Sequence, residues 1–249
     1  MSRHCYDGVT VLQTIGRYPS RVSSTIRPGG RAELVASVLG CALVVTALAI
    51  IWVARLSIPR ELYVSELGAE GMPTERWFEV ALLLIVAGGT AIAWAGRRVR
   101  SRGRVLGAWA PAVSLWAACG LFLFASQVTC TAGCPLPYGD TFNLQDFLHT
   151  LAAVLAFAAA CWAMLQSSFA RDHRVLSVFS ATMGILVAVL AATGGLLSLF
   201  RFQQEFGSRL EFVATTLAIG WLVVFGAVHA VRLLRRKPLP AHEAQQPVG

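Results

Sequence analysis

The chain has 249 residues, of which 56% are hydrophobic and only 14% are charged, and its mean hydropathy is +0.62. A water-soluble domain of this length carries more charge, so the composition excludes one and indicates a membrane protein. The formal net charge is +8. Because the basic residues are concentrated in a few segments between apolar runs, we attribute this charge to membrane orientation and expect no nucleic-acid partner.

Six apolar runs of about 20 residues are long enough to cross a bilayer as helices. They cover residues 34–54, 77–96, 105–126, 147–169, 175–200 and 212–231. The runs are continuous, whereas the strands of a transmembrane barrel are shorter and alternate in hydrophobicity. The sequence therefore predicts an all-α membrane domain at 34–231, a six-transmembrane-helix bundle. It is flanked by a disordered tail at 1–33 and a basic tail at 232–249.

The distribution of Lys and Arg predicts the orientation. Sixteen of the 21 lie in the two tails, in 97–104 and in the short turn at 171–174, and five lie in 55–76, 127–146 and 201–211. The positive-inside rule then places both termini in the cytoplasm, and these three loops on the extracytoplasmic side of the plasma membrane.

Small residues and one proline predict how the spans pack. The runs containing Gly88, Gly89 and Gly194 would let neighbouring helices approach closely. Short cytoplasmic connections predict that the second and third spans, and the fourth and fifth, are antiparallel neighbours. Pro111 lies inside the third predicted span, where we expect it to kink the helix.

Cys130 and Cys134 share the predicted outer loop, where a disulfide would persist. Residues four apart in a strand are about 13 Å apart, too far for a bridge whose Cα atoms lie roughly 4.4–6.8 Å apart. The segment must therefore turn, and Gly133 permits the positive φ that a turn requires. A zinc site is less favoured because no second Cys/His pair lies on this side, and thiol exchange usually needs C-x-x-C spacing. We expect no metal and no cofactor.

The first outer loop carries several carboxylates. Ser65, Glu66 and Gly68 could form part of a site for cations or polar headgroups, or Glu66 could belong to a solvated acidic surface. Glu79 lies just inside the second span, where an ionisable group is costly. It is therefore either a ligand-binding residue or a hydrated carboxylate at the interface.

Asp146 and His149 are three residues apart at the outer start of the fourth span, so they share one helix face. Asp146 could cap this helix, and His149 could simply hydrogen-bond helices together. The functional alternative is a His–carboxylate pair, with Asp146 or Glu66 as the carboxylate. Such a pair would bind a polar headgroup or act as a general base on a lipid ester.

Arg201 and Arg209 are the main cations of the third outer loop. Arginine suits phosphate because it forms bidentate hydrogen bonds, so either residue could bind a lipid phosphate. The alternative is ordinary ion pairing with Glu205 and Glu211.

The stretch "YVSELGAEGMPTERWFEVALLLIVAGG" at 63–89 resembles the bacterial and archaeal membrane family of domain of unknown function 998. That family is in turn similar to the FRAG/DRAM/Sfk superfamily of six-helix proteins. The histidine in "DFLHTLAA", His149, also fits the family. The positions that match its usual "Y-[IV]-S-[DE]-x-G" stretch, and the Pro and Phe that follow, are Tyr63, Val64, Ser65, Glu66, Gly68, Pro73 and Phe78. The resemblance implies a six-helix bundle with a role in lipid asymmetry, sterol retention or lipid-anchor remodelling.

These observations favour a non-enzymatic protein of the cell envelope that binds or organises lipids, with its functional face outside. The alternative is an intramembrane lipid-remodelling enzyme that uses His149 with a carboxylate. A small transporter is a second alternative, disfavoured because the centres of the spans carry almost no ionisable residues. The expected partners are membrane lipids, with another membrane protein left open.

Overall fold

The computed structural model describes residues 28–102, 104–135, 139–170 and 174–235. These ranges contain two short 3-10 helices, η1 Ser65–Gly68 and η2 Gly139–Thr141, and no strand beyond an isolated bridge between Ser101 and Ala170. The predicted all-α fold is confirmed. The six α-helices are α1 Pro28–Leu56, α2 Glu75–Ala95, α3 Pro111–Gln127, α4 Leu144–Ser168, α5 Arg174–Leu199 and α6 Gln204–Arg235.

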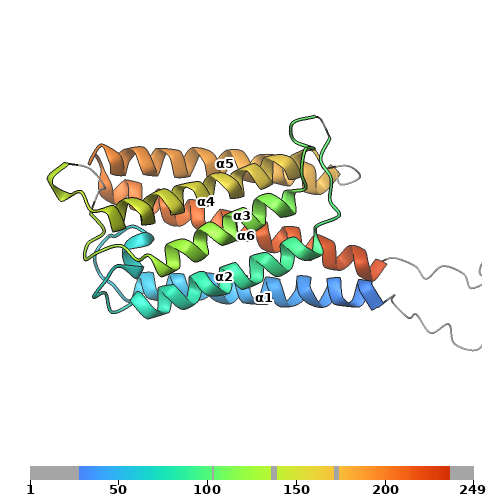
Figure 1. Ribbon diagram of the computed structural model, residues 1–249, viewed down its shortest axis with the longest axis horizontal. Coiled ribbons are helices and arrows are strands. Elements are labelled where there is room, and N and C mark those ends of the chain that lie inside the picture. Colours follow the sequence, from blue (N-terminus) through green and yellow to red (C-terminus); the bar gives the residue numbers. More distant parts are fainter. Residues whose placement is uncertain (1–27, 103, 136–138, 171–173, 236–249) are drawn as a thin grey trace, which may run out of the picture. The chain divides into compact units, whose positions relative to one another are not determined.

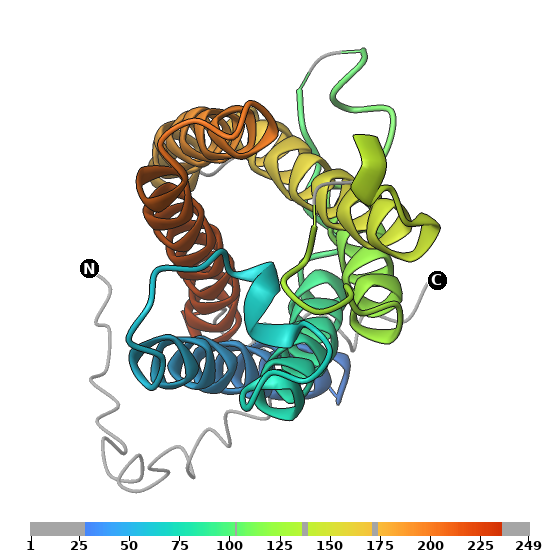
Figure 2. The same ribbon diagram turned by 90° about the vertical axis from the view of Figure 1, so that its left-hand side faces the viewer.

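The six helices form a ring in chain order. Each helix packs on the next, α6 packs back on α1, and α2 also touches α6 across the ring (Figure 2). The contacts of α2 with α3, and of α4 with α5, confirm the predicted neighbours. We call the end that carries 57–74, 128–135, 139–143 and 200–203 the loop end, and the end that carries 96–102 and 104–110 the arginine end (Figure 1).

Five of the described helices, α1, α2, α4, α5 and α6, are long and apolar enough to cross a membrane. The apolar helix α3 has 17 residues. At a rise of about 1.5 Å per residue it is roughly 26 Å long, slightly less than a hydrocarbon core of about 30 Å. Length and composition therefore support a membrane protein.

The third predicted span begins too early. Residues 105–110 form turns, and Pro111 is the first residue of α3, so the expected kink at Pro111 is wrong. Proline suits this position because its φ fits a helix and the first helical N–H needs no partner within the helix. An apolar composition alone does not separate such a segment from a helix.

Gln166 holds the irregular segment in place. The Gln166 side chain is fully buried; its Nε2 donates to the carbonyls of Leu106 at 3.2 Å and Trp109 at 3.0 Å, and its Oε1 accepts from Ser114 Oγ at 2.7 Å. One amide from α4 thus satisfies backbone groups that a helix would otherwise pair, as an apolar surrounding requires.

The last helix is longer than predicted. Because α6 begins at Gln204, Arg209 and Glu211 lie on a helix and not in a loop. At the other end of the chain, α1 begins at Pro28, before the predicted 34. The predictions made for 1–27 and 236–249 concern residues outside the described ranges.

Small residues bring α1 and α2 together. A Cβ built at Gly88 would lie 2.7 Å from the Gly40 carbonyl oxygen, and one built at Gly40 would lie 2.7 Å from the Gly88 carbonyl oxygen. A larger residue at either position would therefore force α1 and α2 apart. The predicted close approach at Gly88 is confirmed, and it explains why this pair packs closely in lipid, where apolar burial alone drives no association.

We expect Gly88→Ala to lower the free energy of unfolding by about 1–3 kcal/mol, because the added methyl group forces α1 and α2 apart. The matched control is Gly120→Ala on α3, where an added Cβ meets nothing within 4 Å. That change should be neutral or stabilising by up to about 1 kcal/mol. Thermal unfolding in mild detergent measures both, and equal effects would contradict the close-approach explanation.

Candidate functional site

The turn that carries the two loop cysteines is closed by a disulfide. Cys130 and Cys134 are bonded, with their Cα atoms 5.0 Å apart, which confirms the predicted pair. Cys134 N donates to Thr131 O at 2.8 Å, and Gly133 has φ +80°. The expected turn and the expected role of Gly133 are therefore both present.

Asp146 ties this turn to α4. Its carboxylate is fully buried and accepts from Thr131 N at 2.7 Å and from Thr131 Oγ1 at 2.9 Å. The cap of α4 is Asn143, whose side chain accepts from Gln145 N at 3.0 Å. Asp146 thus binds the disulfide turn, in place of the capping alternative.

His149 satisfies the end of α3. Its ring is 5% exposed, and Nδ1 lies 2.7 Å from Val128 O and 3.1 Å from Ala125 O. Carbonyl oxygens only accept hydrogen bonds, so we assign the proton to Nδ1, which leaves Nε2 as an acceptor in the neutral ring. Without His149 these carbonyls at a helix end would lack partners in an apolar surrounding.

Asp146 and His149 lie one turn apart on α4, and both side chains are buried, but their hydrogen bonds go to different partners. Glu66 is also engaged elsewhere: its carboxylate accepts from Tyr63 N at 3.2 Å and pairs with Arg60 at 3.4 Å. Backbone carbonyls, and not a carboxylate, therefore hold Nδ1 of the imidazole. A catalytic role for these three residues stays a prediction.

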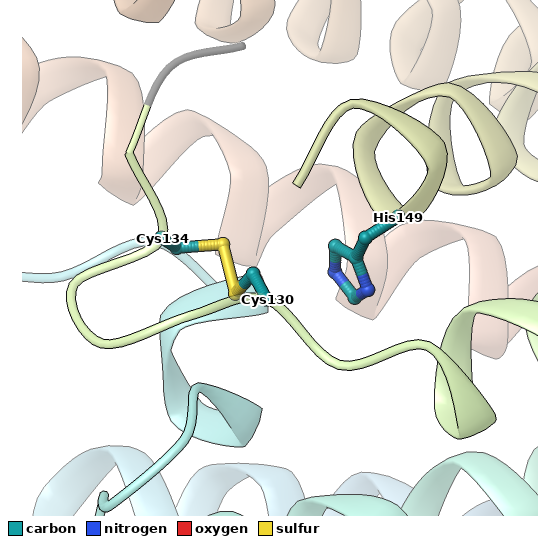
Figure 3. A group of neighbouring side chains, drawn as sticks. All are labelled: Cys130, Cys134 and His149. Atoms are coloured by element: carbon teal, nitrogen blue, oxygen red, sulfur yellow. A yellow bond between two sulfur atoms is a disulfide. The ribbon is translucent and has the colours of Figure 1, made fainter. Parts of the chain in front are cut away.

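The imidazole of His149 faces the disulfide (Figure 3). One ring nitrogen and the sulfur atoms of Cys130 and Cys134 all lie within 4.8 Å of one another. Metal ligation by cysteine needs thiolates, whereas these sulfur atoms are bonded to each other. The cluster as it stands is thus a packed contact between the turn and α4.

A segment of the loop between α1 and α2 lies beside the disulfide turn. Glu70 N donates to Cys130 O at 3.0 Å, and Gln145 Nε2 donates to Glu70 Oε1 at 2.7 Å and to Thr129 O at 2.8 Å. On the other side, Val64 N donates to Glu211 Oε2 at 3.2 Å. Residues 64–70 are therefore held between α4 and α6, and we call this segment with the disulfide turn the roof.

Gly68 lets the roof pack closely on α2. A Cβ at this position would lie 2.4 Å from Cδ1 of Phe78, a buried residue of α2. Both residues belong to the stretch singled out in the sequence. Their role is this contact, which brings η1 onto the first turns of α2.

A cavity of about 110 Å³ lies next to the roof, lined by residues of α1, α2, α3, α4 and α6 but not of α5. Most of the lining is apolar, and it includes Phe122, Phe157 and Met164. The polar lining residues are Ser65, His149, Glu211 and Thr215. Thr215 is only 8% exposed, and its Oγ1 has no hydrogen-bond partner.

The remaining predicted site residues lie away from this cavity. Arg209 pairs with Glu61 at 3.0 Å, Arg201 is exposed between α5 and α6, and Glu79 is half-buried on α2. None of these three lines the cavity. Burial opposes the ionisation of Glu61, but hydrogen bonds and charge from Arg209 and Arg55 lower its pKa overall. Arg209 is therefore held by an ion pair with Glu61, and not with Glu205 or Glu211, the partners named from the sequence.

Sequence reasoning missed Thr215 and gave Glu211 only a remote role as a possible partner. Thr215 lies within an apolar run, where a threonine often bonds to its own helix, so the sequence alone gives no sign that its hydroxyl is unpaired. Glu211 was placed in a loop because the sixth helix was predicted to begin later. The ring arrangement brings both of them to the cavity with His149.

We expect Asp146→Ala to lower the free energy of unfolding by about 1–3 kcal/mol, because Thr131 N–H would lose its buried acceptor. The disulfide should also be reduced faster by dithiothreitol, since the turn is no longer fixed to α4. Asp140→Ala, at an exposed position in η2, is the matched control and should change neither property. Equal reduction rates in all three proteins would show that Asp146 does not hold the turn.

We compared the sequence with known proteins and protein families. A search of curated proteins and a search of solved structures each found no match. The wider similarity to the FRAG/DRAM/Sfk superfamily stays a prediction. The model of the family described as "Protein of unknown function (DUF998)" matches residues 35–228, which include all six helices in whole or in large part. The chain therefore belongs to the DUF998 family.

Proposed function

We propose that this protein binds the apolar part of a lipid inside its helix bundle and acts without catalysis. The observation that carries the proposal is the cavity beneath the roof. Its walls are apolar, its polar groups include His149 and Glu211, and the buried Thr215 hydroxyl has no partner. A buried hydroxyl without a hydrogen bond is costly, so a ligand that supplies one would be stabilised there.

The size of the cavity limits how the ligand enters. Pockets for drug-sized molecules measure about 300–1,000 Å³, whereas this one measures about 110 Å³. We therefore propose that it accepts one hydrocarbon chain only after neighbouring helices separate. Because α6 packs on α1, α5 and α2 and hardly on α3 or α4, a displacement of α3 and α4 away from α6 would be opposed by the packing of α3 on α2 and of α4 on α5.

The polar lining favours a ligand that donates hydrogen bonds. His149 Nε2 and the Glu211 carboxylate are acceptors, and no Lys or Arg is among the described residues that line the cavity. A hydroxyl group fits these acceptors better than a phosphate does. Arg201 and Arg209 do not line the cavity, so a lipid phosphate bound by either of them would lie outside it.

The distribution of Lys and Arg supports placing the roof on the extracytoplasmic side of the membrane. If the arginine end is cytoplasmic, as the positive-inside rule predicts, the roof faces the outside of the plasma membrane. We propose that the protein acts there on the distribution or organisation of envelope lipids.

We expect Ala160→Leu, which enlarges a residue that lines the cavity, to abolish retention of an apolar ligand. Ala158→Leu, at an exposed position on the same helix, is the matched control and should retain it. Thr215→Val has nearly the same shape as wild type and should weaken retention by removing the hydroxyl. Native mass spectrometry of protein extracted from its own membrane in mild detergent measures the bound mass.

Two results would contradict lipid binding in the cavity. One is wild-type protein that carries only detergent. The other is an unchanged lipid mass in Ala160→Leu protein whose thermal unfolding shows that it is folded.

The enzyme alternative is favoured only by the presence of His149 at the cavity. If His149 is a general base, His149→Ala should abolish turnover of a labelled lipid in proteoliposomes. His149→Gln should be inactive as well, although its side chain can still donate to the α3 carbonyls. Our proposal predicts no turnover by the wild-type protein. Turnover that depends on His149 would replace binding by catalysis as the function.

A further inference from the structure

A second pocket lies at the arginine end and has a chemistry opposite to that of the cavity. Its volume is about 580 Å³, and it is lined by three arginines of 97–100, residues 107–110 and the first turn of α3, with Trp116. We propose that this pocket binds a phosphate group, and that the phosphate belongs to the headgroup of an anionic lipid. The inference is independent of the proposed cavity function, because the pocket and the cavity share no lining residue.

The pocket carries a net positive charge. The buried carboxylate of Glu33 pairs with Arg97 at 2.9 Å and with Arg98 at 3.2 Å. Arg97 is fixed further by stacking on Trp94 at 4.2 Å. Arg98 keeps 67% of its side chain exposed, and Arg100 is exposed as well. Glu33 thus pairs with two of the three guanidinium groups, and Arg100 donates to the Arg97 carbonyl at 3.1 Å, so the three arginines keep an excess of two positive charges over this carboxylate.

The start of α3 adds to this positive field. Pro111 is the first residue of the helix, and Ala112 and Val113 of its first turn line the pocket. The N-terminus of a helix carries a partial positive charge and favours phosphate groups. Guanidinium groups and this helix end therefore point to the same kind of ligand.

The two tryptophans favour a lipid as the source of the phosphate. Trp109 Nε1 donates to Ser114 Oγ at 2.9 Å, and Trp116 Nε1 donates to Thr90 O at 3.3 Å, so the polar edges of both indoles are already bonded within the protein. Their rings are left as apolar walls beside the arginines. Indole rings next to basic residues are typical of the membrane interface, where headgroup and acyl chain meet.

The test uses native mass spectrometry of the full chain in detergent with equal amounts of phosphatidylglycerol and phosphatidylcholine. We expect wild type to retain phosphatidylglycerol in preference. The double variant Arg98→Gln/Arg100→Gln should retain roughly tenfold less of it. The matched control Arg102→Gln/Arg104→Gln removes the same charge from exposed positions that do not line the pocket, and it should behave as wild type.

A second arm replaces the lipids by inorganic phosphate and follows the shift in thermal unfolding. If phosphate stabilises wild type and the control pair but not the pocket pair, while no lipid preference is seen, the site exists and takes free phosphate. Equal loss of phosphatidylglycerol in both pairs would overturn the proposal, since it would show diffuse attraction to a basic rim. Unchanged binding in both pairs would overturn it too.

Arg98 also contacts Glu33, so folding is checked by the unfolding temperature without lipid. If the double variant is unstable, the comparison of Arg100→Gln with Arg102→Gln gives the same contrast. Arg97 keeps its pair with Glu33 in every variant.

Discussion

The loop end of the protein depends on one requirement: the backbone groups beyond the end of α3 must find partners where little water is present. His149 and Asp146, one turn apart on α4, meet it by bonding to Ala125 and Val128 carbonyls and to Thr131. A buried backbone group without a partner costs free energy comparable to a lost hydrogen bond. Those bonds fix the chain from the last turn of α3 to the disulfide turn.

The roof follows from that fixed segment. Cys130 O accepts from Glu70 N, and Glu211 on α6 accepts from Val64 N, so residues 64–70 are held between the disulfide turn and α6. The ring of helices leaves an interior that residues of α4 and α6 line from opposite sides. Two of the polar groups that line the cavity also bond to backbone at this end of the bundle: Glu211 holds Val64 of the roof, and His149 holds the end of α3.

The cavity and the arginine pocket differ in chemistry. The cavity offers acceptors and a lone hydroxyl, whereas the pocket of Arg97, Arg98 and Arg100 offers donors and positive charge. A neutral amphiphile and an anionic headgroup would therefore not compete. This difference is already present in the sequence as the uneven distribution of Lys and Arg, although the pocket itself is a product of the fold.

Much of the fold could be predicted because a bilayer is crossed by long apolar helices. The turn at Cys130–Cys134 could be predicted because a disulfide allows only a short distance between its Cα atoms. The shared face of Asp146 and His149 followed from helical spacing. Their partners did not, since Thr131 and Val128 are brought to them by tertiary contacts. The error at Pro111 has a related cause. Residues 105–110 are apolar yet irregular, and the side-chain amide of Gln166, far along the chain, stabilises this conformation by donating hydrogen bonds to its carbonyls. Thr215 shows the same limit, because a missing hydrogen bond cannot be recognised in a sequence.

The central claim is that the interior of the ring accepts a hydrocarbon chain beneath the roof. An experimental structure of the protein in a lipid nanodisc prepared from its native membrane tests this most directly. We expect elongated density between α2, α3, α4 and α6, with a polar end within hydrogen-bonding distance of His149 Nε2, Glu211 or Thr215 Oγ1. A closed interior with helices in the same positions and no density, or density of water alone, would contradict it.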